Sequence, residues 1–198
     1  MSGPWLPSLL VSHWHPAITV DLAMAAAATL YMLGTRRVRT RWPLRRTLSF
    51  LAGLGCIVLA VDSGIDTYDD QLLSVHMVQH MLLLLVAPLL LLSGRPLILA
   101  LRALPSPQRR ALARALYRLA ALTRPGFCLA VFCVVLVVTH LPFFYDATVR
   151  HPALHDAEHG LYLIAGTLLW WPLLDADPVP AHRMSGLGRL VYLLATIW

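Results

Sequence analysis

Long apolar stretches constrain the fold of this chain more than any other sequence feature. Residues 82–92 contain one proline and no charged side chain, and 58% of the whole chain is apolar while only 13% is charged. Soluble domains are on average about 45–50% apolar and about 25% charged. The composition therefore excludes a cytosolic enzyme, a disordered regulator and a disulfide-stapled secreted module, and it predicts a polytopic membrane protein.

Apolar stretches of helical length recur along the chain and are predicted to cross the membrane. A sixth stretch, residues 187–198, holds only twelve residues before the chain stops, too few to cross a bilayer as a straight helix. Pro88 is expected to bend the third span. The predicted fold class is an all-α, polytopic transmembrane helix bundle. We expect a single integral membrane domain over residues 1–198, with a truncated sixth span and its natural C-terminal part missing. The five complete spans are predicted at residues 16–34, 47–61, 72–92, 126–141 and 154–174.

The arginines of the chain predict its orientation. All sixteen basic residues are arginine, and they give a formal net charge of +6. The loop over residues 35–46 holds six arginines and the loop over 93–125 holds seven, whereas residues 62–71 hold four aspartates and no arginine. The positive-inside rule places the arginine loops in the cytoplasm, and the aspartate loop and the N-terminus outside. Because the arginines lie between apolar spans, we expect no nucleic-acid partner.

The longer arginine loop is predicted to contain a cytoplasmic amphipathic helix over residues 106–122. Ser106 can cap this helix, and Pro107 suits its first position. Leucines share one face and arginines occupy much of the rest, so the helix is expected to lie on the inner leaflet. A structural role or a contact with anionic lipid explains such a helix.

The predicted orientation collects the histidines at one membrane face. The spans and loops follow from arginines and apolar runs alone, yet only His182 of the nine histidines falls on the cytoplasmic side. Polar groups at this depth are costly and often functional. The histidines expected at the outer face are His13, His15, His76, His80, His140, His151, His155 and His159.

Two histidine pairs have the spacing of metal ligands. His76 and His80 are four residues apart at the start of the third span, and His155 and His159 repeat this spacing at the start of the fifth. Residues at i and i+4 lie on the same face of a helix. One pair supplies two imidazoles to a metal ion, and two facing helices supply four.

Neighbouring side chains extend this hypothesis or compete with it. Met77 and Met81 offer thioethers, which favour copper(I), although a methionine in a leucine-rich span more often serves packing. Asp156 and Glu158 can orient the imidazoles or ligate a metal themselves. Asp21 is interpreted as an interfacial carboxylate, with support of a metal site as the alternative. The predicted metal ligands are His76, His80, His155, His159, Met77 and Met81.

Motifs around these histidines resemble the CtaG family of caa-type cytochrome c oxidase assembly factors. The resemblance covers most of the chain from Trp14 onward. It implies a multi-pass protein of the bacterial plasma membrane that has cytochrome c oxidase subunits as partners and delivers or inserts copper. By carry-over, His76, His80, His155 and His159 would handle this copper. The resembling stretches are His76-Met-Val-Gln-His80-Met-Leu-Leu, Ala87-Pro88, Leu92-Ser-Gly-Arg-Pro96-Leu, His155-Asp-Ala-Glu-His159-Gly-Leu-Tyr162 and Trp170-Trp171-Pro172.

The sequence thus predicts a copper-binding assembly factor that contacts the lipid bilayer and is not an enzyme. The first alternative is a haem-binding membrane redox protein with His80 and His159 as axial ligands. Two histidines on adjacent turns of one helix cannot reach opposite haem faces, so the paired arrangement favours a metal ion. Zinc also accepts four imidazoles. The second alternative is a metal-free structural partner of the oxidase, and the oligomeric state is left open.

Overall fold

The computed structural model describes residues 14–68, 72–175 and 184–196, and within them the chain is helical and contains no strand. This confirms the all-α prediction. Proline occupies the first helical position of several elements, where its missing N–H group costs no hydrogen bond. The elements are α2 (Ile18–Arg37), α3 (Leu44–Asp62), α4 (Gly64–Tyr68), α5 (Leu73–Met81), the π-helical segment η1 (Leu82–Val86), α6 (Ala87–Ser93), α7 (Pro96–Ala103), α8 (Ser106–Arg118), the 3-10 turn η2 (Ala120–Thr123), α9 (Pro125–Thr139), α10 (Pro142–Arg150), α11 (Pro152–Leu173) and α12 (Gly186–Leu194).

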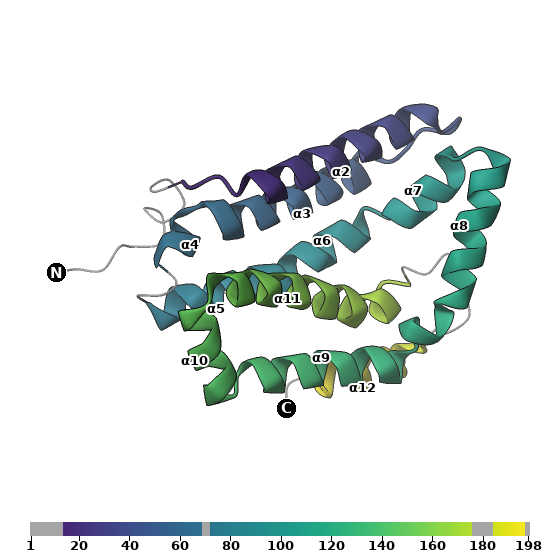
Figure 1. Ribbon diagram of the computed structural model, residues 1–198. Helices are drawn as coiled ribbons and strands as arrows, with labels where there is room; N and C mark the ends of the chain where they lie inside the picture. The colour runs from purple at the N-terminus through teal and green to yellow at the C-terminus, as the bar shows by residue number, and fades with distance from the viewer. Residues whose placement is uncertain (1–13, 69–71, 176–183, 197–198) are drawn as a thin grey trace.

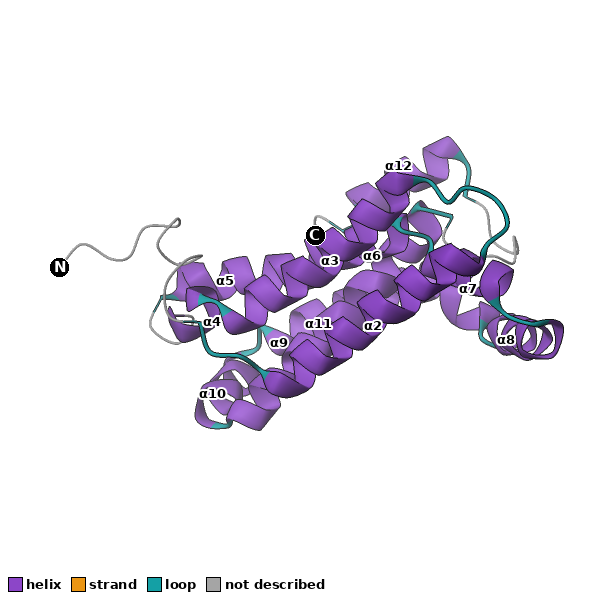
Figure 2. Ribbon diagram, turned by 90° about the horizontal axis from the view of Figure 1, so that it is seen from above, coloured by secondary structure: helices purple, strands orange, loops and turns teal. Residues whose placement is uncertain are grey.

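The long helices form an elongated bundle that short helices cross at both ends (Figure 1). Helix α3 packs on α6, α11 packs on both α6 and α9, and α2 contacts α3 and α7. Helix α8 joins α7 to α9 across one end, while α10 joins α9 to α11 across the other (Figures 1 and 2). The starts of α5 and α11 therefore lie at the end opposite α8.

Among the described residues, three helical segments are long and apolar enough to cross a membrane, namely Ile18–Arg37, Leu44–Asp66 and Leu73–Ala103. The pair Pro125–Thr139 and Pro142–Thr148, bent by 74°, counts as a fourth if it forms one broken span. These segments match the first four predicted spans. Helix α11 covers the predicted fifth span, but polar residues in its first turns lower its mean hydropathy, and it is not among the segments apolar enough to cross a membrane. The number of five spans and the orientation therefore stay predictions.

Lipid-facing character is clearest on α2. Ile18, Leu22 and Leu30 on this helix are 66–70% exposed, whereas its Tyr31 is buried. An apolar helix that turns such side chains outward is typical of a surface solvated by acyl chains. The bundle is therefore compatible with a multi-pass membrane protein.

The third apolar segment is longer and less regular than the sequence predicts. It does not end near residue 92 but continues to Ala103. The left-handed conformation of Arg95 (φ 55°) interrupts the helix after Ser93, and a new helix begins at Pro96. The bend expected at Pro88 stays a prediction, and the structure shows the π-helical segment η1 just before this proline, in which the Ala87 N–H donates to the Leu82 carbonyl. A π-helical segment leaves some backbone carbonyl groups without a hydrogen bond inside the helix. The Leu85 carbonyl accepts one from the Trp170 indole at 3.0 Å instead.

The main core lies where α3, η1, α9 and α11 meet, and its fully buried members include Tyr162, Leu83 and Ala165. Tyr192 of α12 joins this core, and its hydroxyl lies 3.3 Å from the Leu169 carbonyl. This packing holds α11 against η1, which continues α5, and the predicted histidine pairs lie on α5 and α11.

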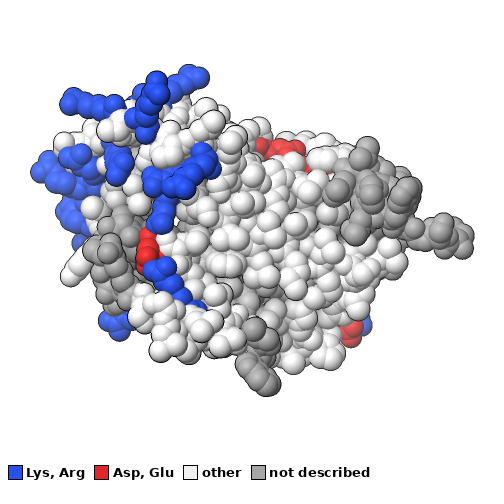
Figure 3. Space-filling model, turned by 180° about the vertical axis from the view of Figure 1, so that it is seen from behind, with Lys and Arg blue, Asp and Glu red and all other residues white. Residues whose placement is uncertain are grey.

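Arginines gather at one end of the molecule (Figure 3). Helix α8 accounts for part of this group and coincides with much of the predicted amphipathic helix. The predicted cap is wrong, however, because Ser106 is the first helical residue and no side chain caps the helix. Pro105 takes the preceding position in an extended conformation (φ −59°, ψ 156°), which moves the start of the helix one residue earlier.

Candidate metal centre

Two helices that are distant in sequence bring the predicted histidine pairs together. On α5, the ring centroids of His76 and His80 are 4.0 Å apart, and on α11 those of His155 and His159 are 4.3 Å apart. Between the helices, the His76 and His155 rings stack at 5.4 Å and the His80 and His159 rings lie at 6.2 Å. The four histidines therefore form one group, called the histidine cluster below.

Three members of the histidine cluster have the geometry of a metal site. One ring nitrogen each of His76, His80 and His155 lies within 4.8 Å of the other two. Two imidazole nitrogens bound to one ion, each at about 2.0–2.1 Å, are at most roughly 4.2 Å apart. Small side-chain rotations would therefore bring all three nitrogens into the coordination shell of a single ion.

The histidine cluster is largely shielded from solvent. His76, His80 and His159 are 5–6% exposed, and His155 is half-buried. Within the described part of the chain, neither ring nitrogen of His80 has a hydrogen-bond partner. A neutral imidazole carries one donor and one acceptor, and each buried group left unsatisfied costs about 1–3 kcal/mol. A bound metal ion would satisfy the acceptor nitrogen of His80, so the donor set fits a metal.

A polar network lies beside the histidine cluster. The Tyr162 hydroxyl lies 2.8 Å from Thr139 Oγ1 and 3.0 Å from Glu158 Oε1, and the Tyr162 ring centroid is 4.4 Å from that of His80. Thr139 Oγ1 in turn donates to the Val135 carbonyl at 2.9 Å. Tyr162 therefore links α9 to α11, holds the buried carboxyl group of Glu158 and packs on a candidate ligand.

Several residues of this site escaped the sequence analysis. Tyr162 follows His155 by seven residues and His159 by three, so its helical spacing was a signal that could have found it. Thr139 comes from α9, and Tyr145 of α10 places its ring 5.8 Å from that of His76. No spacing in the sequence connects these two residues to the histidines, because only the packing of α9 and α10 brings them there.

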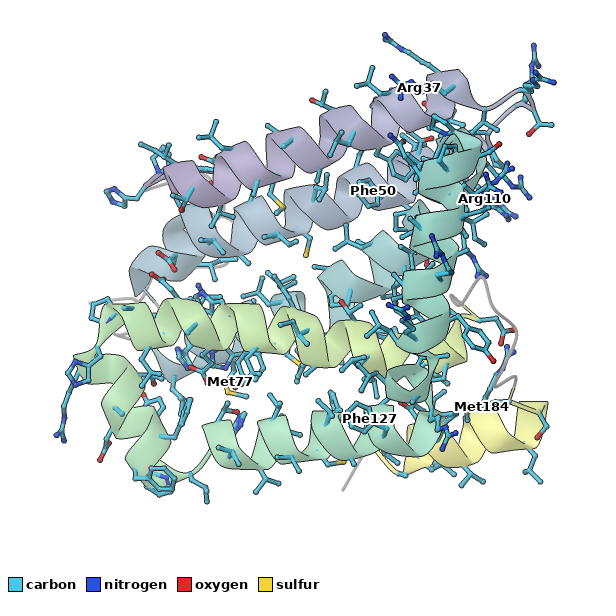
Figure 4. All side chains as sticks on the ribbon, turned by 45° about the vertical axis from the view of Figure 1, so that its right-hand side comes forward. Arg37, Phe50, Met77, Arg110, Phe127 and Met184 are labelled. Atoms are coloured by element: carbon cyan, nitrogen blue, oxygen red, sulfur yellow. The ribbon has the colours of Figure 1, made fainter. Side chains whose placement is uncertain are left out.

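The other predicted site residues occupy different surroundings. Met77 and Met81 each follow a histidine by one position, which turns a side chain about 100° around the helix. Met81 is 50% exposed, and Figure 4 shows Met77 near the end of the bundle that α10 crosses. Asp156 is exposed, and Asp21 hydrogen-bonds to Asp62, which links α2 to α3. Ligation by the two methionines stays a prediction.

The other histidines that the structure describes lie outside the histidine cluster. His15, His140 and His151 are exposed, and His140 Nδ1 lies 2.8 Å from the Leu136 carbonyl. His13 and His182 lie outside the described residues. The histidine cluster lies at the end of the bundle opposite α8 (Figure 1).

Replacing Tyr162 by phenylalanine is expected to destabilise the bundle by about 1–3 kcal/mol, because it leaves the buried Glu158 carboxyl group without the Tyr162 hydroxyl. Thermal unfolding in detergent measures this effect. Tyr117→Phe is the matched control, because the Tyr117 side chain is 71% exposed. Equal unfolding temperatures for the two variants would show that the network does not stabilise the fold.

An apolar helical bundle with a buried histidine cluster at one end and arginines at the other defines a membrane protein with a candidate metal centre. The family model described as cytochrome c oxidase caa3 assembly factor (Caa3_CtaG) matches residues 29–198. The chain belongs to this family, which confirms the resemblance drawn from the histidine motifs.

Curated relatives come from mycobacteria. The chain is 30% identical over 190 residues to the uncharacterized protein Mb0105 of Mycobacterium bovis, covering 91% of this chain and 28% of the relative. It is 31% identical over 180 residues to the uncharacterized protein ML1998 of Mycobacterium leprae, covering 84% of this chain and 27% of the relative. The chain thus spans less than a third of the length of these proteins. No solved structure matches the chain significantly.

Proposed function

We propose that this chain binds copper in the histidine cluster and assists its delivery to, or insertion into, cytochrome c oxidase in the plasma membrane. The observation that carries the proposal is the buried His80 ring, which has no hydrogen-bond partner for either nitrogen among the described residues and lies against three other imidazoles. The family supplies the link to oxidase assembly. A role in assembly points to a non-catalytic protein whose partners are oxidase subunits and lipid.

The donor set suits a metal that must be released again. His76, His80, His155 and His159 would hold copper through imidazole nitrogens, which bind it without the closed thiolate cage of a storage site. The free cysteines lie elsewhere, with Cys56 and Cys128 buried in the helical packing. His155 is half-buried whereas His76 and His80 are buried, so exchange with a partner would begin on the His155 side of the cluster.

The packing of the histidine cluster favours an ion over haem. A haem with His80 and His159 as axial ligands would need its macrocycle between the two rings. Tyr162 lies 4.4 Å from His80, and His155 lies 4.3 Å from His159, centroid to centroid. Both neighbours would have to move aside for a macrocycle, whereas an ion needs only small rotations.

Metal analysis and absorbance spectra of purified, copper-loaded protein test the proposal. The double variant His76→Ala/His80→Ala is expected to lose bound copper. Loss of a residue that hydrogen-bonds to a metal ligand lowers metal affinity roughly 10–100-fold, and loss of two ligands should lower copper affinity further. His15→Ala/His151→Ala is the matched control, because it removes two exposed histidines and should retain copper.

The alternatives give different results in the same experiment. A Soret band in the purified wild type would establish haem binding and overturn the copper proposal. If the purified protein retains zinc in preference to copper, the histidine cluster is a zinc site and the copper proposal is wrong. The wild type and His76→Ala/His80→Ala could also contain equal amounts of copper, or no copper after loading under reducing conditions. Either result would favour the alternative of a metal-free structural partner of the oxidase.

A further inference from the structure

A polar cavity lies at the arginine-rich end of the bundle, far from the histidine cluster. It has a volume of about 340 Å³ and lies where the first turns of α3 meet the end of α6 and the residue after α11. This volume is at the lower end of the range for small-molecule sites. The described residues that line the cavity are Arg45, Arg46, Ser49, Ser93, Arg95 and Leu174.

The wall of this cavity is built by close helix packing. An added Cβ atom at Gly94 would lie 2.6 Å from Phe50 Cβ and 3.1 Å from the Arg46 carbonyl, so only glycine lets the end of α6 approach α3 this closely. The Tyr31 hydroxyl donates to the Gly94 carbonyl at 2.7 Å, which ties α2 to the same point. Figure 4 shows Phe50 on α3 beside this region.

Two of the arginines that line the cavity, Arg46 and Arg95, are held by the surrounding structure. Arg95 has φ 55°, a conformation that residues other than glycine adopt only when the surrounding structure holds them there. The guanidinium of Arg46 lies over the Trp42 ring, 5.0 Å from its centroid, and the Trp42 indole donates to the Tyr31 hydroxyl at 2.9 Å. Contacts anchor both side chains at the cavity, because Arg46 stacks on Trp42 and the Arg95 guanidinium donates to the Asp175 carbonyl.

The cavity offers positive charge and hydrogen-bond donors. None of the described residues that line it is acidic. Arg95 donates to the Asp175 backbone carbonyl, which uses part of the five-donor capacity of its guanidinium. The hydroxyl groups of Ser49 and Ser93 donate to the Leu90 and Leu89 carbonyls, so the arginines supply the donors for a ligand.

We propose that this cavity binds the phosphate group of an anionic phospholipid. Guanidinium groups bind phosphate through paired, charge-assisted hydrogen bonds. Leu44 and Leu48, four residues apart on the first turns of α3, are 70% and 57% exposed and flank Arg45 in sequence. An exposed apolar strip beside an arginine-lined cavity matches a ligand with acyl chains better than an acidic peptide. The site lies where apolar helices end, the level of lipid headgroups, and it does not depend on the copper proposal.

Lipid binding to the purified full chain in a zwitterionic detergent tests this site. Phosphatidylglycerol is expected to bind more tightly than phosphatidylcholine and to raise the unfolding temperature. Arg46→Gln/Arg95→Gln should weaken phosphatidylglycerol binding about tenfold or more, because each arginine contributes charge-assisted bonds. Arg36→Gln/Arg39→Gln, which changes two exposed arginines that do not line the cavity, is the control with the same loss of charge, and it should bind phosphatidylglycerol like the wild type.

Further variants and ligands in the same binding experiment distinguish an anionic phospholipid from other anions. Arg46→Lys/Arg95→Lys keeps the charge but loses the paired hydrogen bonds, so an intermediate affinity supports the proposal. If the glutamine double variant does not fold, Arg45→Gln, which changes an exposed side chain, should still weaken binding measurably. Inorganic phosphate that binds as tightly as the lipid, an acidic peptide that binds when phosphatidylglycerol does not, or an equal loss of affinity in Arg36→Gln/Arg39→Gln would overturn the proposal.

Discussion

Alanine in place of Gly166 is expected to destabilise this protein strongly, by about 3 kcal/mol or more. An added Cβ atom would lie 1.9 Å from the Leu84 carbonyl oxygen and 2.9 Å from Pro88 Cγ. The first of these atoms belongs to the backbone of η1, so a rotamer change cannot relieve the clash. Helix α11 would have to move away from η1 and would break the Trp170 bond to the Leu85 carbonyl.

The same helix provides a matched control for Gly166→Ala. An added Cβ atom at Gly160 meets nothing within 4 Å, and alanine favours a helix by roughly 1 kcal/mol over glycine. In detergent, the unfolding temperature of Gly160→Ala should therefore equal or exceed that of the wild type, and the unfolding temperature of Gly166→Ala should be far lower. Copper retention should fall with Gly166→Ala as well, because the histidine cluster spans the two helices that would separate. Similar unfolding temperatures for both variants would contradict the close approach of α11 to η1.

Loss of the α5 histidines is expected to reduce oxidase activity to the level of cells that lack this chain. This prediction rests on the proposed function, in which His76 and His80 hold the copper that reaches the oxidase. Oxidase activity in membranes of a complemented deletion strain measures it for His76→Ala/His80→Ala. His15→Ala/His151→Ala, which changes two exposed residues, should restore activity fully.

Two readouts distinguish copper delivery from a structural role. Excess copper in the growth medium should partly restore activity in the His76→Ala/His80→Ala strain, because free ions then bypass a lost delivery site. Immunoblotting of the membranes should show that the variant accumulates like the wild type. Full activity after all four histidines are replaced would favour a structural partner whose histidines do not hold metal.

Much of the helical layout was predictable, because long apolar runs leave few alternatives to helices. The predicted spans over 16–34 and 47–61 overlap closely with the segments Ile18–Arg37 and Leu44–Asp66. The sharp turn from α9 into α10, bent by 74°, was not predicted. Its position follows from Pro142 at the start of α10, but the course of α10 across the end of the bundle depends on what it packs against.

The candidate site was predictable in part for the same reason. The spacing of His76 with His80 and of His155 with His159 placed each pair on one face of its helix, since helical periodicity is local. The exposure of Met81 and the bond between Asp21 and Asp62 depend on neighbours that periodicity does not specify.

The sequence by itself therefore determined most of the helices and the composition of each histidine pair, because these depend on residues a few positions apart. It also determined the arginine-rich end, because the arginines lie in alternate loops between apolar spans. Only the tertiary structure decided that the two pairs face each other, with His76 stacked 5.4 Å from His155. That meeting requires α11 to lie directly against η1, which the missing side chain of Gly166 allows. Contacts between distant segments are set by the shape of packed side chains, and no local pattern in the chain encodes that shape.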